Sequence, residues 1–171
     1  MISDGATPPM TRFDRIVRLV LATLMLLAIV NLLIGVFLRY VMTEITDFFD
    51  WDMIRYTWVE EVGELALAYM TLIGAAIGIR ERAHFTLHLG VQRLSAGTQR
   101  VIGMINAVLI VGFGLLAAWH GWGLSRLNTQ LTSPALEINL AWLYASAVIG
   151  GVLIAIYGVR ELVALQHRRA A

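Results

Sequence analysis

The chain has 171 residues, of which 58% are apolar and only 15% carry a charge, and its mean hydropathy is +0.73. Soluble domains are nearer half apolar and a quarter charged, so this composition indicates a protein whose solvent is a lipid bilayer. The chain has no cysteine, which excludes disulfide frameworks, thiol redox catalysis and cysteine-ligated metal sites. The net charge of +1 comes with no basic patch, so no nucleic-acid partner is expected.

Four long apolar stretches follow one another along the chain, at residues 16–38, 61–79, 101–124 and 138–159. A helix needs about 20 mostly apolar residues to cross roughly 30 Å of hydrocarbon, and each stretch can supply that number. Apolar and polar residues do not alternate within them, which favours helices over a barrel. The sequence therefore predicts an all-α integral membrane protein with four transmembrane helices, in a single membrane domain that covers residues 1–171.

The arginines, which account for all 13 basic residues, are divided unequally between the two sides of these helices. Ten lie in the N-terminal segment, the loop from Arg80 to Arg100 and the C-terminal tail, whereas the other two loops hold three. The positive-inside rule therefore predicts cytoplasmic N- and C-termini. The first helix has too long an apolar run for a cleaved signal peptide, so we expect a retained signal anchor.

Two loops are predicted to contain short interfacial segments. In the first, residues 44–57, apolar side chains share one helical arc, which suits a short helix in the outer interface. This segment is either a connector with aromatic anchors or a docking surface for an external partner, with the candidate residues Asp47, Asp50, Trp51, Asp52 and Arg55. In the second loop, residues 80–100, apolar and polar residues alternate only at the beginning. An extended segment and a short interfacial helix therefore both remain open.

Three glutamates open the second apolar stretch. Glu60 is accounted for by the helix dipole, but Glu61 and Glu64 are ionisable groups inside a membrane segment, which often mark a function or a buried partner. We expect Arg39, at the outer end of the first helix, to pair with one of them. The uncharged part, residues 65–79, is only 15 residues long, so this helix spans fully only if Glu64 lies at the boundary or faces protein.

An ion pathway would need more polar groups in the membrane interior than the sequence offers. Those available are uncharged and scattered, and they suit interhelical hydrogen bonds instead: Asn31, Thr71, Asn106 and Ser146. Nucleophile–base arrangements and phosphate-binding motifs are absent, so no catalytic residues and no enzymatic activity are predicted. Gly74 and Gly78 make the second helix a candidate packing centre, either within the bundle or against another protein.

The histidines do not predict a cofactor or metal site. His84 and His88 are spaced like metal ligands on a helix, but a third ligand is missing. His120 lies near the outer end of its helix beside two tryptophans, where an interfacial anchor explains it. Axial haem ligands would have to lie within the helices, so neither a cofactor nor a metal is expected.

Four motifs, in order, resemble the small membrane subunit (DctQ type) of tripartite ATP-independent periplasmic (TRAP) transporters. They are Leu38-Arg39-Tyr40-Val41; Trp58-Val59-Glu60-Glu61; Gly74-Ala75-Ala76 with Arg80 and Ala83-His84-Phe85; and Ser133-Pro134-Ala135-Leu136 followed by Ala141-Trp142 and Tyr144. The resemblance covers most of residues 12–165. Two departures are that the family usually has an aspartate where His88 stands, and that the loop of residues 44–58 is longer than is typical.

The resemblance implies a role in solute uptake across a bacterial inner membrane. Such systems pair a periplasmic substrate-binding protein with a large membrane subunit that moves organic acids or related anions with an ion gradient, commonly sodium. The small subunit contacts the large one as a scaffold and is not expected to hold substrate. Candidate residues for this interface, or for structural ion pairs, are Arg39, Glu60, Glu61, Glu64, Gly74, Gly78, Arg80 and His84.

A different class of function is the alternative: a membrane anchor subunit of a redox enzyme complex. Haem absorbance in the purified chain would indicate this second function. Association with a many-helix membrane protein and the loss of uptake without this chain would indicate the scaffold of a transporter. A free-standing small transporter is disfavoured because the interior polar groups are few.

Overall fold

The computed structural model describes residues 10–49, 56–81 and 95–167. The described chain is helical apart from turns and one isolated bridge between Thr132 and Asn139. Its elements are α1 (Arg12–Phe37), the π-helical turn η1 (Leu38–Met42), α2 (Thr43–Phe48), α3 (Thr57–Arg80), α5 (Ala96–Leu127) and α6 (Ala141–His167). Four helical runs are long and apolar enough to cross a membrane, which confirms the predicted all-α class and the four spans.

Helices α1 and α5 start before their apolar stretches because a polar side chain outside each stretch caps the helix. The Thr11 hydroxyl accepts a hydrogen bond from the Asp14 amide, and the Asp14 carboxylate accepts one from the Thr11 amide, so α1 starts before residue 16. The Ser95 hydroxyl accepts a hydrogen bond from the Thr98 amide at the start of α5. At headgroup level, charged side chains are solvated and do not end a helix.

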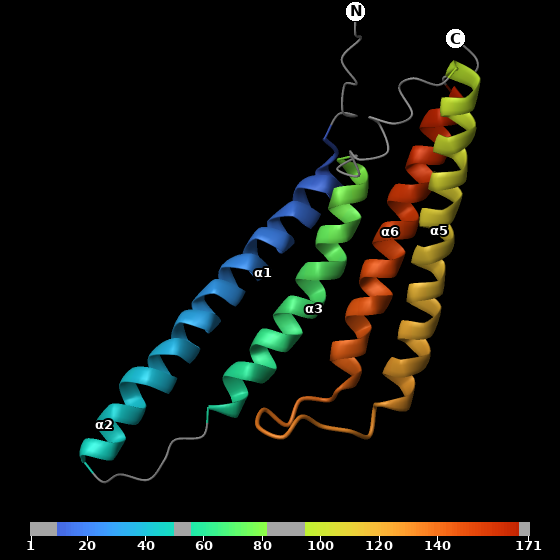
Figure 1. Cartoon of the computed structure of the whole chain (residues 1–171). Helices are drawn as coiled ribbons and strands as arrows, with labels where there is room; N and C mark the ends of the chain where they lie inside the picture. Colours follow the sequence, from blue (N-terminus) through green and yellow to red (C-terminus); the bar gives the residue numbers. More distant parts are fainter. Residues whose placement is uncertain (1–9, 50–55, 82–94, 168–171) are drawn as a thin grey trace, which may run out of the picture.

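The first span also runs further than residue 38 at its other end. The π-helical turn η1 continues directly into α2, so Arg12–Phe48 forms one helical run (Figure 1). A separate interfacial helix was predicted for residues 44–57. Its residues 44–48 instead belong to α2, which continues the first helical run. Residues 50–55 lie outside the described chain.

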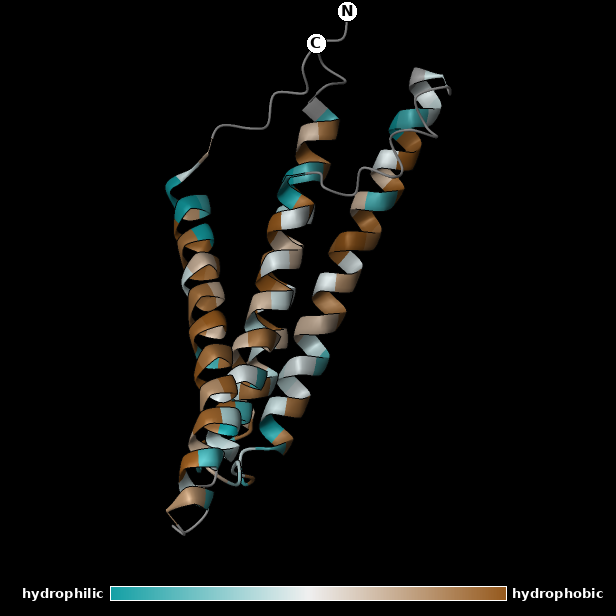
Figure 2. Cartoon of the chain, turned by 60° about the vertical axis from the view of Figure 1, so that its left-hand side comes forward, coloured by the Kyte–Doolittle hydropathy of each residue, from teal (hydrophilic) through white to brown (hydrophobic). Residues whose placement is uncertain are grey.

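The four long helices form a row in the order α1, α3, α6, α5 (Figure 1). The end where α1 and α5 start and α3 and α6 finish is called the basic end; its described charges are Arg12, Asp14, Arg15, Arg18, Arg80, Glu81, Arg100, Arg160 and Glu161. The other is the acidic end, with Arg39, Glu44, Asp47, Glu60, Glu61, Glu64, Arg126 and Glu137. Figure 2 shows apolar residues along the helices and hydrophilic residues gathered towards their ends.

The two clusters of buried apolar side chains lie between the helices, in the half of their length nearer the basic end. Val17 of α1 packs against Ile73 and Ile77 of α3, and all three are buried. Ala76 of α3 is fully buried in a second cluster with two residues of α6, Ile154 and Tyr157. Helices α1 and α6 therefore both pack against α3 at this end.

Helices α5 and α6 approach each other closely at two glycines. A Cβ atom added to Gly114 would lie 2.7 Å from the Gly151 carbonyl oxygen, and one added to Gly151 would lie 2.6 Å from the Ala118 amide nitrogen. These backbones can approach only because neither glycine has a side chain. At the predicted packing centre, a Cβ on Gly74 would lie 3.8 Å from Leu21 Cδ1, an ordinary contact, and one on Gly78 would meet no described residue within 4 Å.

Candidate functional site

A buried carboxylate at the basic end joins three helices. The Asp14 side chain is 2% exposed, accepts four hydrogen bonds and forms a buried ion pair with Arg80. Its Oδ2 accepts from the Thr11 amide at 2.9 Å and from the Thr11 hydroxyl at 2.7 Å, and it lies 3.0 Å from Arg80 Nη2. Its Oδ1 accepts from the Tyr157 hydroxyl at 3.1 Å and from Arg160 Nη1 at 3.2 Å. α1, α3 and α6 therefore meet at one carboxylate.

The two arginines of this cluster are in different environments. The Arg80 side chain is 8% exposed, whereas that of Arg160 is 47% exposed and lies over the rings of Phe13 and Tyr157. A buried ion pair adds little stability over a well-packed apolar pair, but losing one partner leaves an uncompensated charge. The cluster therefore determines which helix faces meet more than it stabilises the fold.

Sequence reasoning missed Asp14 as a site residue. The threonine three residues before it is a helix-start signal, since a capping box needs such a pair, and this signal could have been recognised. The partners on α3 and α6 could not, because they are far away in sequence. Arg80, predicted as an interface or ion-pair residue, is in fact an internal ion-pair partner. Beside it, Arg18 pairs with Glu81 at 2.6 Å.

The three glutamates at the start of α3 have three different environments. The Glu61 carboxylate accepts hydrogen bonds from the backbone amides of Ala135 and Leu136, each at 2.8 Å. Glu60 pairs with Arg39 at 2.9 Å, and both side chains are about two-thirds exposed. Glu64 is exposed and has no hydrogen-bond or ion-pair partner among the described residues. Arg39 was expected to pair with Glu61 or Glu64, but one residue's difference in helix rotation brings Glu60 to it instead.

Glu61 holds a turn that the loop between α5 and α6 builds from its own backbone. The Ser133 amide donates to the Ile138 carbonyl at 2.8 Å, and the Leu140 amide donates to the Leu131 carbonyl at 2.9 Å. These bonds also explain why α6 starts at residue 141 and not at 138. The two amides that Glu61 binds lie at the tip of this turn. One carboxylate of α3 therefore holds the tip of the loop in place.

Four uncharged polar side chains were predicted to form interhelical hydrogen bonds, and Asn31 does so. Thr71 and Asn106 have no hydrogen bond among the described residues. Asn31 is buried and donates to the Val59 carbonyl of α3 at 2.8 Å, which is an interhelical bond of the expected kind. Ser146 instead bonds within its own helix, to the Leu143 carbonyl at 2.6 Å. The Tyr69 hydroxyl adds a link from α3 to α6 that was not predicted, at 2.9 Å from the Trp142 carbonyl oxygen.

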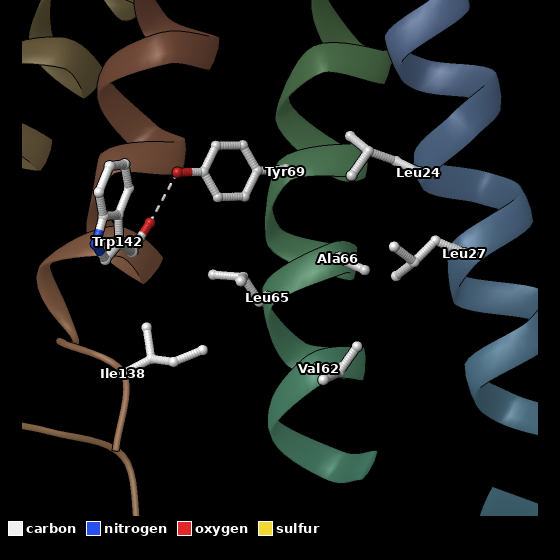
Figure 3. A pocket seen from close by; sticks show the side chains of 8 residues that line it. All are labelled: Leu24, Leu27, Val62, Leu65, Ala66, Tyr69, Ile138 and Trp142. Atoms are coloured by element: carbon white, nitrogen blue, oxygen red, sulfur yellow. Dashed lines mark hydrogen bonds between the residues drawn. The ribbon is translucent and has the colours of Figure 1, made fainter. Parts of the chain in front are cut away.

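An apolar groove runs over α3 between α1 and the start of α6 (Figure 3). Its volume is about 490 Å³, and it is lined by Leu24, Leu27, Val62, Leu65, Ala66, Tyr69, Ile138 and Trp142. Tyr69 points towards Trp142 and uses its hydroxyl there, as the dashed line in Figure 3 shows. No charged side chain lines the groove, so it has no group that would hold an organic anion.

The remaining candidates fall partly outside the described chain. His84 and His88 lie outside it, as do four residues of the predicted docking surface: Asp50, Trp51, Asp52 and Arg55. Asp47 and His120 are described and exposed. Within the described ranges, no group of three histidine, aspartate or glutamate side chains is arranged to hold a metal ion.

Comparison with known proteins identifies the family. The model of the DctQ component of the tripartite ATP-independent periplasmic transporters matches residues 28–168. The chain belongs to the DctQ family. No curated protein gave a significant match. The DctQ family is a component of a transporter and not a family of enzymes, and the four apolar helices make this chain a multi-pass membrane protein.

Three of the four DctQ-like motifs of this chain meet at the acidic end. Arg39, in the π-helical turn, contacts Glu60 at the start of α3, and the neighbouring Glu61 binds the amides of Ala135 and Leu136. Motifs that lie in three separate parts of the sequence are therefore joined in one structural unit.

Proposed function

We propose that this DctQ protein is the scaffold subunit of a TRAP transporter in a bacterial inner membrane. In this role it supports a large membrane subunit that takes up an organic acid or a related solute with an ion gradient, commonly of sodium. A periplasmic binding protein delivers the solute. The family match over residues 28–168 is the observation that carries this proposal.

The use of the polar side chains supports a scaffold that does not conduct. Asp14, Glu61 and Asn31 each hold one part of the chain against another. The apolar groove over α3 has no charged side chain in its lining to hold an anion. A row of helices also presents more lateral surface than a closed bundle of the same size, which suits a frame around a larger partner.

We further propose an orientation and an outer docking surface. The basic end lies in the cytoplasm, because arginine-rich loops are retained there. The acidic end, with Asp47 exposed on α2, then faces the periplasm. Together with Asp50, Trp51, Asp52 and Arg55 it forms the surface on which the binding protein docks.

The test is uptake into proteoliposomes that contain the large subunit with or without this chain. Binding protein and solute are supplied outside, and an inward sodium gradient is imposed. We expect uptake only when both membrane subunits are present. Equal uptake by the large subunit alone would refute the scaffold role, and a matched preparation without the sodium gradient tests the coupling ion.

The alternative function, a membrane anchor of a redox enzyme complex, is not supported. The family that matches this chain is a transporter component, and the match extends over most of the four-helix region. We therefore do not propose it further.

A further inference from the structure

The exposed residues of α3 lie on one face of the helix. Within Thr57–Arg80 they are Thr57, Glu60, Glu64, Leu67, Thr71 and Ala75. Their spacing of three or four residues places them in one stripe along the helix. The buried residues Ile73, Ala76 and Ile77 pack towards α1 and α6, so the stripe faces away from the rest of the chain. We call this stripe the open α3 face.

The open α3 face differs in chemistry from the other exposed helix surfaces. Leu67 is its only large apolar residue. On α1 and α5, by contrast, the exposed surface is rich in large apolar side chains, such as Leu19 at 68%, Leu109 at 65% and Phe113 at 61%. Large aliphatic and aromatic side chains suit lipid, whereas small and hydrogen-bonding side chains are enriched where membrane helices pack together.

Glu64 makes contact with lipid costly on this face. The uncharged residues 65–79 span only about 22 Å, which is less than the roughly 30 Å of hydrocarbon that the helix must cross. Glu60 and Glu61 have partners, but Glu64 has none among the described residues. Ionisable side chains at membrane depth usually face protein and have a partner. The Thr71 hydroxyl, two turns deeper on the same face, also has no hydrogen bond within the described chain.

We propose that a transmembrane helix of the large subunit packs on the open α3 face and offers a cationic side chain to Glu64. This inference rests on the proposed function and names the surface and the charge that the partner must present. The small Ala75, and Gly78 near it, leave room for the backbone of that helix to come close, since a Cβ on Gly78 would meet nothing within 4 Å. Complementary charge selects the partner and the register of this contact.

The first test compares the association of variants with the large subunit in detergent. We expect Glu64→Leu to weaken co-purification at least about tenfold, because the cation of the partner loses its counter-charge. The thermal stability of the isolated chain should stay the same or rise, since an unpaired charge is removed. Glu44→Leu is the matched control, because Glu44 is also an exposed glutamate of the acidic end without a partner among the described residues, but it lies on α2. Glu64→Asp should retain part of the association.

The second test maps the contact in the assembled complex. A photoreactive benzoylphenylalanine is placed at Leu67 or Ala75, and at Phe113 of α5 as the control. We expect covalent adducts with the large subunit from the two α3 positions and not from α5. Unchanged association of Glu64→Leu, or adducts from α5 only, would overturn this inference while the proposed function stands. Failure of the wild-type chain to associate would refute the proposed function itself.

Discussion

Arg80 Nη2 lies 3.0 Å from Asp14 Oδ2, and this contact joins the first turn of α1 to the last turn of α3. Both side chains are buried, so each charge compensates the other where water is largely excluded. Tyr157 and Arg160 bring α6 to the same carboxylate. One aspartate in an arginine-rich segment therefore aligns three of the four membrane-spanning helices at the basic end.

Replacing Asp14 should destabilise the chain more than replacing any exposed carboxylate. Asp14→Ala leaves the Arg80 charge buried without a partner, so we expect a loss of about 3 kcal/mol in the free energy of unfolding. Thermal unfolding in detergent measures it. Asp47→Ala is the control, because Asp47 is exposed and has no partner among the described residues. Equal stability of the two variants would contradict the bridging role of Asp14.

Removing the Glu61 carboxylate should loosen the loop between α5 and α6. In Glu61→Ala the amides of Ala135 and Leu136 lose their acceptor, so we expect their hydrogen exchange to speed up by roughly an order of magnitude. Exchange measured by mass spectrometry over residues 130–140 reports it. Glu60→Ala should leave this exchange unchanged, since Glu60 bonds only to Arg39. Similar exchange in both variants would show that Glu61 does not hold the loop.

A methyl group on Gly151 should separate α5 from α6. Gly151→Ala places a Cβ 2.6 Å from backbone atoms of α5, so we expect a destabilisation of about 1–3 kcal/mol by overpacking. Gly112→Ala is matched to it, because a Cβ on Gly112 meets nothing within 4 Å. That control should be neutral or more stable by about 0.5–1 kcal/mol, since alanine favours helix. Thermal unfolding of the two variants decides between close packing and a looser contact.

The orientation can be measured directly because the chain has no cysteine of its own. Thr132→Cys at the acidic end and Arg12→Cys at the basic end are both exposed positions. In intact spheroplasts we expect a membrane-impermeant maleimide to label the first and not the second. Lysed membranes, in which both should react, serve as the control. The opposite labelling pattern would reverse the proposed topology.

Several structural features could be predicted from local sequence, and others could not. The four spans follow from runs of apolar residues, and the Asn31 hydrogen bond to α3 follows from a lone amide in such a run. The pairing of Arg39 could not be predicted, because Glu60 and Glu61 differ by about 100° around the helix and only the placement of α1 selects one. The close packing at Gly114 and Gly151 could not be singled out from the sequence, since glycines on several helices look alike there.

The sequence by itself determined that the chain is helical, that it crosses a membrane four times and that its arginines lie mainly on one side. These properties are sums over neighbouring residues, so no knowledge of distant contacts is needed. Only the tertiary structure decided that Asp14 is buried, that Glu61 holds the loop between α5 and α6, and that Glu64 is left exposed. The reason is physical: the partner of a side chain depends on the rotation and tilt of whole helices, and these are set by packing between residues far apart in the chain.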